Sequence, residues 1–97
     1  MKALMISTIK ITDPAGFQKY MEKTQQIARP YGAELVFRGK RSATLNGTET
    51  DGTMVVVVGF PDIDALERWN NSLEYQDIVA LRDSSSVQVM TAYGPLE

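Results

Sequence analysis

The sequence predicts an α+β fold in which one four-stranded antiparallel sheet carries helices on one of its faces. The chain has 97 residues, a length that suits a single domain over residues 1–97. Its 43% hydrophobic and 23% charged residues are ordinary proportions for a folded globular protein. Strand-like and helix-like apolar patterns follow one another in the order strand, helix, strand, strand, helix pair, strand.

Separate signals mark the first strand and the first helix. Residues 3–11 are rich in β-branched side chains and are expected to form a strand. Asp13 then suits the N-cap of a helix and Pro14 its first position, while Gly32 suits its end. Between them, six side chains repeat at helical spacing and form one face. These are Phe17, Tyr20, Met21, Thr24, Ile27 and Ala28.

The middle of the chain predicts a β-hairpin. Its first strand is expected over residues 33–45, where Gly39 indicates a bulge or a close approach of backbones. Residues 46–52 are polar and contain two turn signals, so they form the connecting loop. Residues 53–60 form the second strand, which has no polar face.

The remaining residues predict two helices and a final strand. Asp62 suits the N-cap of a helix that continues to Asn70, and Asp64 complements its dipole. Ser72 is expected to start a further helix of about ten residues. Residues 87–93 form the last strand. Right-handed crossovers then place the first and third strands at the centre of the sheet, which is the ferredoxin-like βαββαβ arrangement.

The two central strands are apolar on both sides. Val55 and Val57 lie on one side of the third strand, whereas Val56 and Val58 lie on the other. A sheet face of roughly 380 Å², estimated from strand spacing and length, would match the largest apolar patch of an ordinary monomer. A second copy packed sheet to sheet would cover it, so the sequence predicts a homodimer with a total buried area of about 1,600 Å² or more. The alternative is that a loop or the chain's own tail covers this face.

Composition excludes several classes of function. The chain has no cysteine and no histidine, which excludes disulfides, Cys/His zinc sites, thiol nucleophiles and Ser-His-Asp triads. No metal and no cofactor are therefore expected. A net charge of −2 does not suit nucleic acid, and no apolar run approaches the roughly 20 residues that span a membrane. We find no targeting signal at the amino terminus and expect a cytoplasmic protein.

Seven short motifs along the chain stand out together. They are Thr12-Asp13-Pro14, Tyr31-Gly32, Phe37-Arg38-Gly39, Gly59-Phe60-Pro61, residues 65–69, residues 72–76 and Leu81-Arg82. With these motifs the chain resembles domain-of-unknown-function family 1330 over essentially its whole length, most specifically between Trp69 and Arg82. The resemblance implies a dimeric α+β barrel with a small-molecule pocket between sheet and helices. The wider superfamily contains cofactor-free monooxygenases, isomerases and haem-degrading enzymes, and the absence of histidine departs from the last of these.

Arg38 is the candidate clamp for an anionic group. If its strand places it on the barrel side, its planar guanidinium suits a carboxylate or enolate. The alternative is an exposed edge-strand arginine paired with Glu34 or another surface acid. On the first interpretation, Arg38→Ala keeps the fold and loses about 1.5–3 kcal/mol of ligand affinity.

Four further residues are candidates for the pocket wall. Trp69 can stack on a flat ligand, although a single tryptophan at this spacing also suits the core. Tyr75 and Arg82 lie seven residues apart on one helical face, and the alternative is a core tyrosine with an arginine reaching solvent. Tyr31 suits either a ligand contact or a cap contact before Gly32. Two function classes follow: a cofactor-independent enzyme acting on a small carbonyl or aromatic metabolite, in which tyrosine and arginine steer a developing oxyanion, and a non-catalytic dimer that binds a small molecule or a partner.

Overall fold

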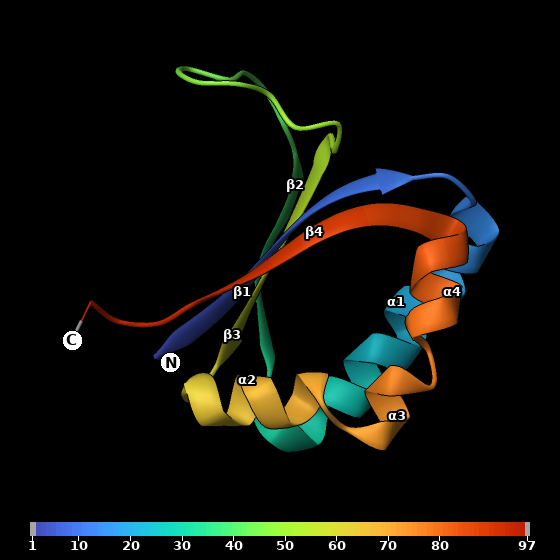
Figure 1. Ribbon diagram of the computed structural model, residues 1–97, viewed down its shortest axis with the longest axis vertical. Helices are drawn as coiled ribbons and strands as arrows, with labels where there is room; N and C mark the ends of the chain where they lie inside the picture. The colour runs from blue at the N-terminus through green and yellow to red at the C-terminus, as the bar shows by residue number, and fades with distance from the viewer. Residues whose placement is uncertain (1, 97) are drawn as a thin grey trace.

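The computed structural model describes residues 2–96. The nine elements of this part of the chain are β1 (Ala3–Ile11), α1 (Pro14–Ala28), the 3₁₀ turn η1 (Arg29–Tyr31), β2 (Glu34–Lys40), β3 (Met54–Phe60), α2 (Ile63–Asn70), α3 (Leu73–Gln76), α4 (Val79–Ser85) and β4 (Ser86–Tyr93). The strands form one antiparallel sheet in the order β2-β3-β1-β4, and the helices cover one of its faces (Figure 1). The α+β ferredoxin-like prediction and the central position of the first and third strands are confirmed.

The hairpin differs from its prediction in length and in the position of its bulge. β2 ends at Lys40 rather than at residue 45, and residues 41–53 form a loop that projects beyond the sheet (Figure 1). Arg41 holds this loop closed, because its Nη1 donates hydrogen bonds to the carbonyl oxygens of Thr50 (3.0 Å) and Gly52 (2.7 Å). The bulge lies between Leu35 and Phe37. Gly39 instead allows a close approach, since a Cβ there would lie 2.6 Å from the Phe37 ring.

The helix starts were predicted with mixed success. The Asp62 carboxylate accepts a hydrogen bond from Ala65 N at 2.8 Å and the Ser72 hydroxyl accepts one from Tyr75 N at 3.2 Å, so both caps are confirmed. Asp13, however, makes no side-chain capping bond, and its own N–H donates to the carbonyl of Ser85 at 3.0 Å. The expected ten-residue helix is also divided into α3 and α4, because the backbone leaves the helical region at Ile78 (φ −105°, ψ 3°).

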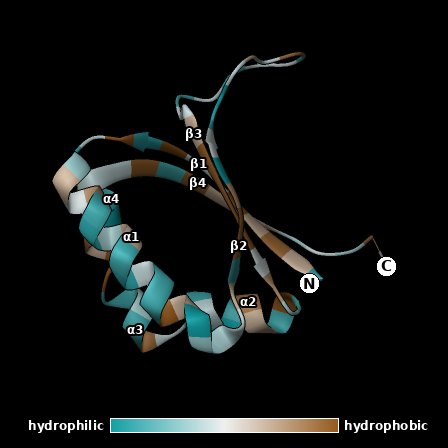
Figure 2. Ribbon diagram, turned by 180° about the vertical axis from the view of Figure 1, so that it is seen from behind, coloured by the Kyte–Doolittle hydropathy of each residue, from teal (hydrophilic) through white to brown (hydrophobic). Residues whose placement is uncertain are grey.

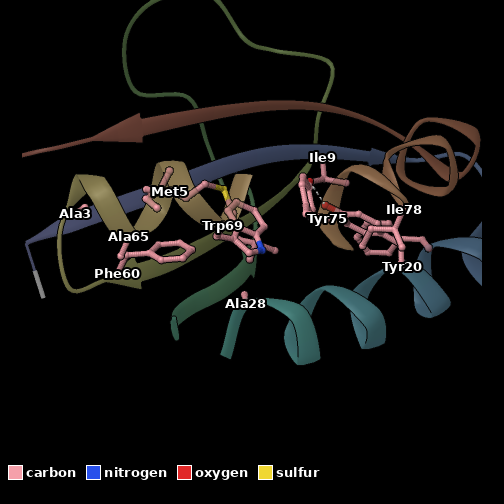
Figure 3. Close-up of a cluster of buried hydrophobic side chains, with 13 residues drawn as sticks. Ala3, Met5, Ile9, Tyr20, Ala28, Phe60, Ala65, Trp69, Tyr75 and Ile78 are labelled. Carbon is pink, nitrogen blue, oxygen red and sulfur yellow. Dashed lines mark hydrogen bonds between the residues drawn. The ribbon is translucent and has the colours of Figure 1, made fainter. Parts of the chain in front are cut away.

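A row of aromatic rings forms the centre of the core (Figure 3). The row starts in β3 and continues through α2 and α3 to α1 on the helix side of the sheet. Trp69 and Tyr75 at its centre are 1% and 0% exposed. Successive ring centroids are 5.4, 4.3, 6.5 and 6.0 Å apart; three of these distances lie within the usual range of about 4.5–7 Å for aromatic pairs, and the Trp69–Tyr75 distance is slightly shorter. The row runs Phe60, Trp69, Tyr75, Tyr20, Phe17.

Hydrophobic residues are frequent along the strands of the sheet (Figure 2), and many of their side chains lie on the face away from the helices. Strand register places Ile6 of β1, Val57 of β3 and Thr91 of β4 side by side on this face. At its two edges, Phe37 and Val89 are 57% and 60% exposed. On the edge strands, Arg38 and Gln88 lie on the helix side, where they pair with Val56 and Ile9. Glu34 and Thr91 are the polar residues of these strands that lie on the open face together with Phe37 and Val89.

None of the helices within residues 2–96 is both long and apolar enough to cross a membrane. In the same residues, Asp and Glu side chains form no group of three that could hold a metal ion.

Gly32→Ala should be the more harmful of two matched glycine substitutions. Gly32 and Gly47 both have positive φ, 82° and 90°, which costs an alanine about 1–2 kcal/mol. A Cβ at Gly32 would also lie 2.6 Å from Pro61 Cγ, whereas one at Gly47 meets nothing within 4 Å. We expect urea unfolding to show a larger loss of stability for Gly32→Ala than for Gly47→Ala. Equal losses would mean that the Pro61 contact relaxes at no cost.

Candidate functional site

A cavity of about 300 Å³ lies between the sheet and the helix layer. Its walls come from the helix side of β1, β2 and β3, from the inner face of α1, and from Trp69 at the end of α2. Strand alternation explains this arrangement, because Met5, Ser7 and Ile9 all point from β1 to the helix side. Most of the wall is apolar. The apolar side chains from the strands are Met5, Ile9, Leu35, Val56, Val58 and Phe60.

The polar part of the cavity wall is almost uncharged. Among the described residues that line it, Arg29 alone carries a formal charge, and no carboxylate is present. The other polar side chains are hydroxyls and amides, which bind oxygen-bearing groups without demanding a charge. They are Ser7, Tyr20, Thr24, Gln25 and Gln88.

Two buried polar atoms of the cavity wall have no hydrogen-bond partner. They are Thr24 Oγ1 and Trp69 Nε1, and they are the two such side-chain atoms found within residues 2–96. Buried polar atoms in folded proteins are nearly always paired, and an unpaired one costs about 1–3 kcal/mol. The indole N–H requires an acceptor, and the hydroxyl takes either a donor or an acceptor. Neither atom is accessible to solvent in this structure, so an oxygen atom from water or a ligand would satisfy each of them only where it comes within hydrogen-bond distance.

A chain of hydrogen bonds leads from the surface of α4 to the cavity. Arg82 Nη1 donates to Tyr75 Oη at 3.2 Å, and Tyr75 Oη lies 2.8 Å from Tyr20 Oη. Because Arg82 only donates, the Tyr75 proton is directed to Tyr20 or to the weaker sulfur acceptor of Met90 at 3.7 Å. When Tyr75 donates to Tyr20, the Tyr20 proton is available to an acceptor in the cavity.

This chain favours a neutral Tyr20. Burial is the main reason that the pKa of Tyr20 lies well above its ordinary value, and the neighbouring Tyr75 adds to the shift, whereas the nearby Thr24 hydroxyl and the charge of Arg82 reduce it. Burial lowers the pKa of Arg82, but hydrogen bonds to Asp83 and Tyr75 outweigh this effect, so the net shift is upward. At neutral pH the chain of hydrogen bonds therefore runs from the Arg82 guanidinium cation through the Tyr75 hydroxyl to a protonated Tyr20. Tyr20 is thus suited to donate a hydrogen bond and unsuited to act as a base.

The structure brings together some of the residues singled out from the sequence. Trp69 lines the cavity, and the Tyr75 ring packs against it at a centroid distance of 4.3 Å. Arg82 reaches the cavity only through Tyr75 and Tyr20. Tyr31 packs against the core without being part of the cavity wall.

Arg38 lies on the helix side of the sheet but outside the cavity wall. Arg38 pairs with Val56, which lines the cavity, so it lies on the face of the sheet that a clamp for the ligand requires. Its side chain is exposed on an edge strand and forms no ion pair with Glu34 within the described residues. Sequence reasoning overlooked Thr24 and Arg29, and it gave Tyr20 little weight. A hydroxyl on the apolar face of α1 was the one available signal for Thr24.

These features define a class: a ferredoxin-like α+β domain with a cavity between sheet and helices. The sequence matches the model of the domain of unknown function DUF1330 over residues 2–93, and the chain belongs to that family. Among curated proteins, none matches this sequence.

Solved structures share this fold at low sequence identity. A protein of unknown function from Rhodopseudomonas palustris has a TM-score of 0.79 at 14% identity, covering 98% of this chain and 82% of that one. SnoaB, a cofactor-independent oxygenase from Streptomyces nogalater, has a TM-score of 0.70 at 13% identity, with coverages of 99% and 94%. A dabb family protein with a ferredoxin-like fold from Mesorhizobium loti has a TM-score of 0.63 at 13% identity, with 100% of both chains covered. At such identities the likeness shows the fold alone.

Proposed function

We propose that this protein binds a small aromatic or carbonyl metabolite in its cavity and acts on it as a cofactor-independent enzyme of oxygenase or isomerase type. The observation that carries the proposal is the pair of unpartnered buried atoms, Thr24 Oγ1 and Trp69 Nε1, in the wall of a cavity of about 300 Å³. Buried polar groups in folded proteins are nearly always paired, so two unpaired ones in residues that line one cavity support a ligand with oxygen groups.

The volume and shape of the cavity limit the ligand. A cavity of about 150 Å³ holds one benzene ring, so one of twice that volume suits two fused rings. The Trp69 ring and the apolar strand side chains provide flat walls, whereas the hydroxyls provide single polar contacts. A two-ring compound with a phenolic or ketone oxygen meets both conditions.

The enzyme proposal depends on Tyr20. Its protonated hydroxyl is suited to donate a hydrogen bond to an enolate or phenolate oxygen as negative charge develops there. Arg82 donates to Tyr75, and Tyr75 would hold the Tyr20 proton in position when its own hydroxyl donates to Tyr20. Removal of a proton from the substrate would require a base, and among the described residues the cavity wall contains neither a carboxylate nor a histidine.

The proposal includes assembly as a homodimer through the open sheet faces. An exposed face that contains Phe37 and Val89 at its edges and valines at its centre supports it. A cytoplasmic location also stays a prediction, as do the contributions of Arg38 and Tyr31 to the site.

The second candidate function is a non-catalytic dimer that binds the same kind of molecule. The lack of a base in the cavity wall favours it. Oxygen uptake distinguishes the two functions: with naphthalene-1,4-diol as substrate, an oxygenase raises the rate above the spontaneous one, whereas a binding protein does not. Binding without turnover of any phenol or ketone tested would favour the second candidate.

Thr24→Val tests the binding proposal with 2-naphthol as the probe. The near-isosteric valine removes an unpaired hydroxyl, so the ligand-free protein should be more stable, by up to about 1 kcal/mol. Calorimetric affinity for 2-naphthol should fall about three- to tenfold, because one hydrogen bond to the ligand is lost. Trp69 is the only tryptophan in the chain, so quenching of its emission locates the probe in the cavity.

Thr48→Val is the matched control, because Thr48 is exposed in the loop between β2 and β3. It should leave both the affinity and the quenching unchanged. If wild-type protein shows no saturable binding of 2-naphthol or of related two-ring ketones, the cavity does not bind this class and the proposal fails.

A further inference from the structure

We propose that the ligand is an amphipathic two-ring aromatic anion, whose carboxylate lies on Arg29 at the cavity mouth while an oxygen at its other end meets Thr24 and Trp69. This inference rests on the proposed binding function and adds the polarity and orientation of the ligand. Nothing in the sequence motifs points to Arg29.

The cavity has a buried inner end and an open outer end. Tyr20 and Trp69 at the inner end are 3% and 1% exposed. At the outer end, Gln25, Arg29 and Leu35 are all exposed, and Leu35 retains 55% of its accessible surface. A ligand that fills the cavity therefore has one end away from water and one end in contact with it.

The charge at the outer end is positive and uncompensated. Arg29 is the one formal charge among the described lining residues, and it takes part in none of the ion pairs found within residues 2–96. Its backbone is held on both sides, because its N–H donates to the carbonyl of Gln25 and its carbonyl accepts from Gly32 N at 3.0 Å. The guanidinium thus starts from a fixed point, and its planar donors suit a carboxylate.

The spacing along α1 sets the length of the ligand. Arg29 follows α1 directly, five residues after Thr24, so the two backbone positions lie about 7–8 Å apart along the axis at 1.5 Å per residue. Two fused rings with oxygen groups at opposite ends bridge such a span. A single ring would leave one of the two contacts unmade.

Arg29 also lies where a cation stabilises the end of α1 through the helix dipole. That role alone predicts a loss of stability without any effect on ligand preference. Arg38 is the competing clamp, since it lies on the same side of the sheet. Three possibilities therefore have to be distinguished: Arg29 binds the carboxylate, Arg29 only stabilises the end of α1, or Arg38 binds the carboxylate.

Calorimetric titration with three probes separates them. The probes are 6-hydroxy-2-naphthoate, which carries both oxygen groups, 2-naphthol, which lacks the carboxylate, and 2-naphthoate, which lacks the hydroxyl. We expect wild-type protein to bind 6-hydroxy-2-naphthoate about tenfold more tightly than 2-naphthol, and this advantage to shrink with added salt. Arg29→Gln should abolish the advantage and leave the 2-naphthol affinity within about twofold. Arg38→Gln should retain it.

Each of the other outcomes contradicts a specific part of the proposal. If 2-naphthol binds and the carboxylate adds nothing, or if Arg29→Gln retains the advantage, the inference fails while the proposed function stands. If Arg38→Gln alone abolishes the advantage, Arg38 is the clamp and the assignment of Arg29 is wrong. If no probe binds, the proposed function fails together with the inference.

Discussion

Val89→Asp is expected to convert a homodimer of this protein into monomers. Val89 lies on β4 opposite Thr8 of β1, on the sheet face away from the helices, and is 60% exposed in the single chain. In a sheet-to-sheet dimer, twofold symmetry would bury two such carboxylates, and an unpaired buried charge costs several kcal/mol each. Light scattering at micromolar concentration should give the mass of a dimer for the wild type and of a monomer for the variant.

Leu73→Asp is the matched control for this experiment. Leu73 is 80% exposed at the first position of α3, in the helix layer, so it lies away from the open face. The same change of chemistry there should leave the dimer intact. A monomeric wild type would contradict the sheet-face interface, and dissociation caused by both variants would show that added charge, rather than its place, is responsible.

Tyr75→Ala should have the largest effect on stability of the substitutions considered. The Tyr75 ring is 0% exposed and contacts the rings of Trp69 and Tyr20. Its removal leaves a cavity beside Trp69 and takes a hydrogen-bond partner from both Tyr20 and Arg82. We expect a loss of about 3–5 kcal/mol, measured by urea unfolding at fixed protein concentration because dimer stability depends on concentration.

Tyr75→Phe separates the hydroxyl from the ring. It keeps the packing and removes the central oxygen of the chain, so we expect a smaller loss of about 1–3 kcal/mol. Adding Tyr20→Phe should then cost less than Tyr20→Phe costs in the wild type, because the bond between the two hydroxyls is already broken. If the stability losses of Tyr75→Phe and Tyr20→Phe add up to the loss of the double variant, the two hydroxyls are not energetically coupled.

The hydrogen-bonded pair of Tyr20 and Tyr75 predicts that the stability of the fold depends on pH in the alkaline range. The pKa of Tyr20 is raised in the folded protein, so its ionisation above about pH 10 occurs first in the unfolded chain. The contribution of Tyr20 is therefore fully present below that pH and is lost as the pH rises further. Unfolding of Tyr20→Phe should show a shallower loss of stability above pH 10 than unfolding of the wild type.

Sequence alone determined the order of the elements, the two central strands and two of the helix caps. Local patterns encode these features: side-chain period distinguishes strand from helix, and Asp62 and Ser72 precede their helices by one position. Trp69 was also found from the sequence, as a single large aromatic residue at the end of an amphipathic helix. The two-sided apolar strands predicted the open face for the same local reason.

Tertiary structure decided which side chains meet. Tyr20 and Tyr75 are separated by 55 residues, and only the packing of α1 against α3 brings their hydroxyls to 2.8 Å. Thr24 became a candidate when its hydroxyl proved to be buried without a partner, which no local pattern encodes.

The tertiary structure also decided which side chains of β2 face the helices. The bulge between Leu35 and Phe37 places Leu35 and Arg38 on the helix side and Phe37 on the open face. A regular strand would have put Leu35 and Phe37 on one face. Local periodicity thus determines whether each segment forms a helix or a strand. Contacts between distant segments decide which of its side chains form a site, because those contacts depend on register and packing.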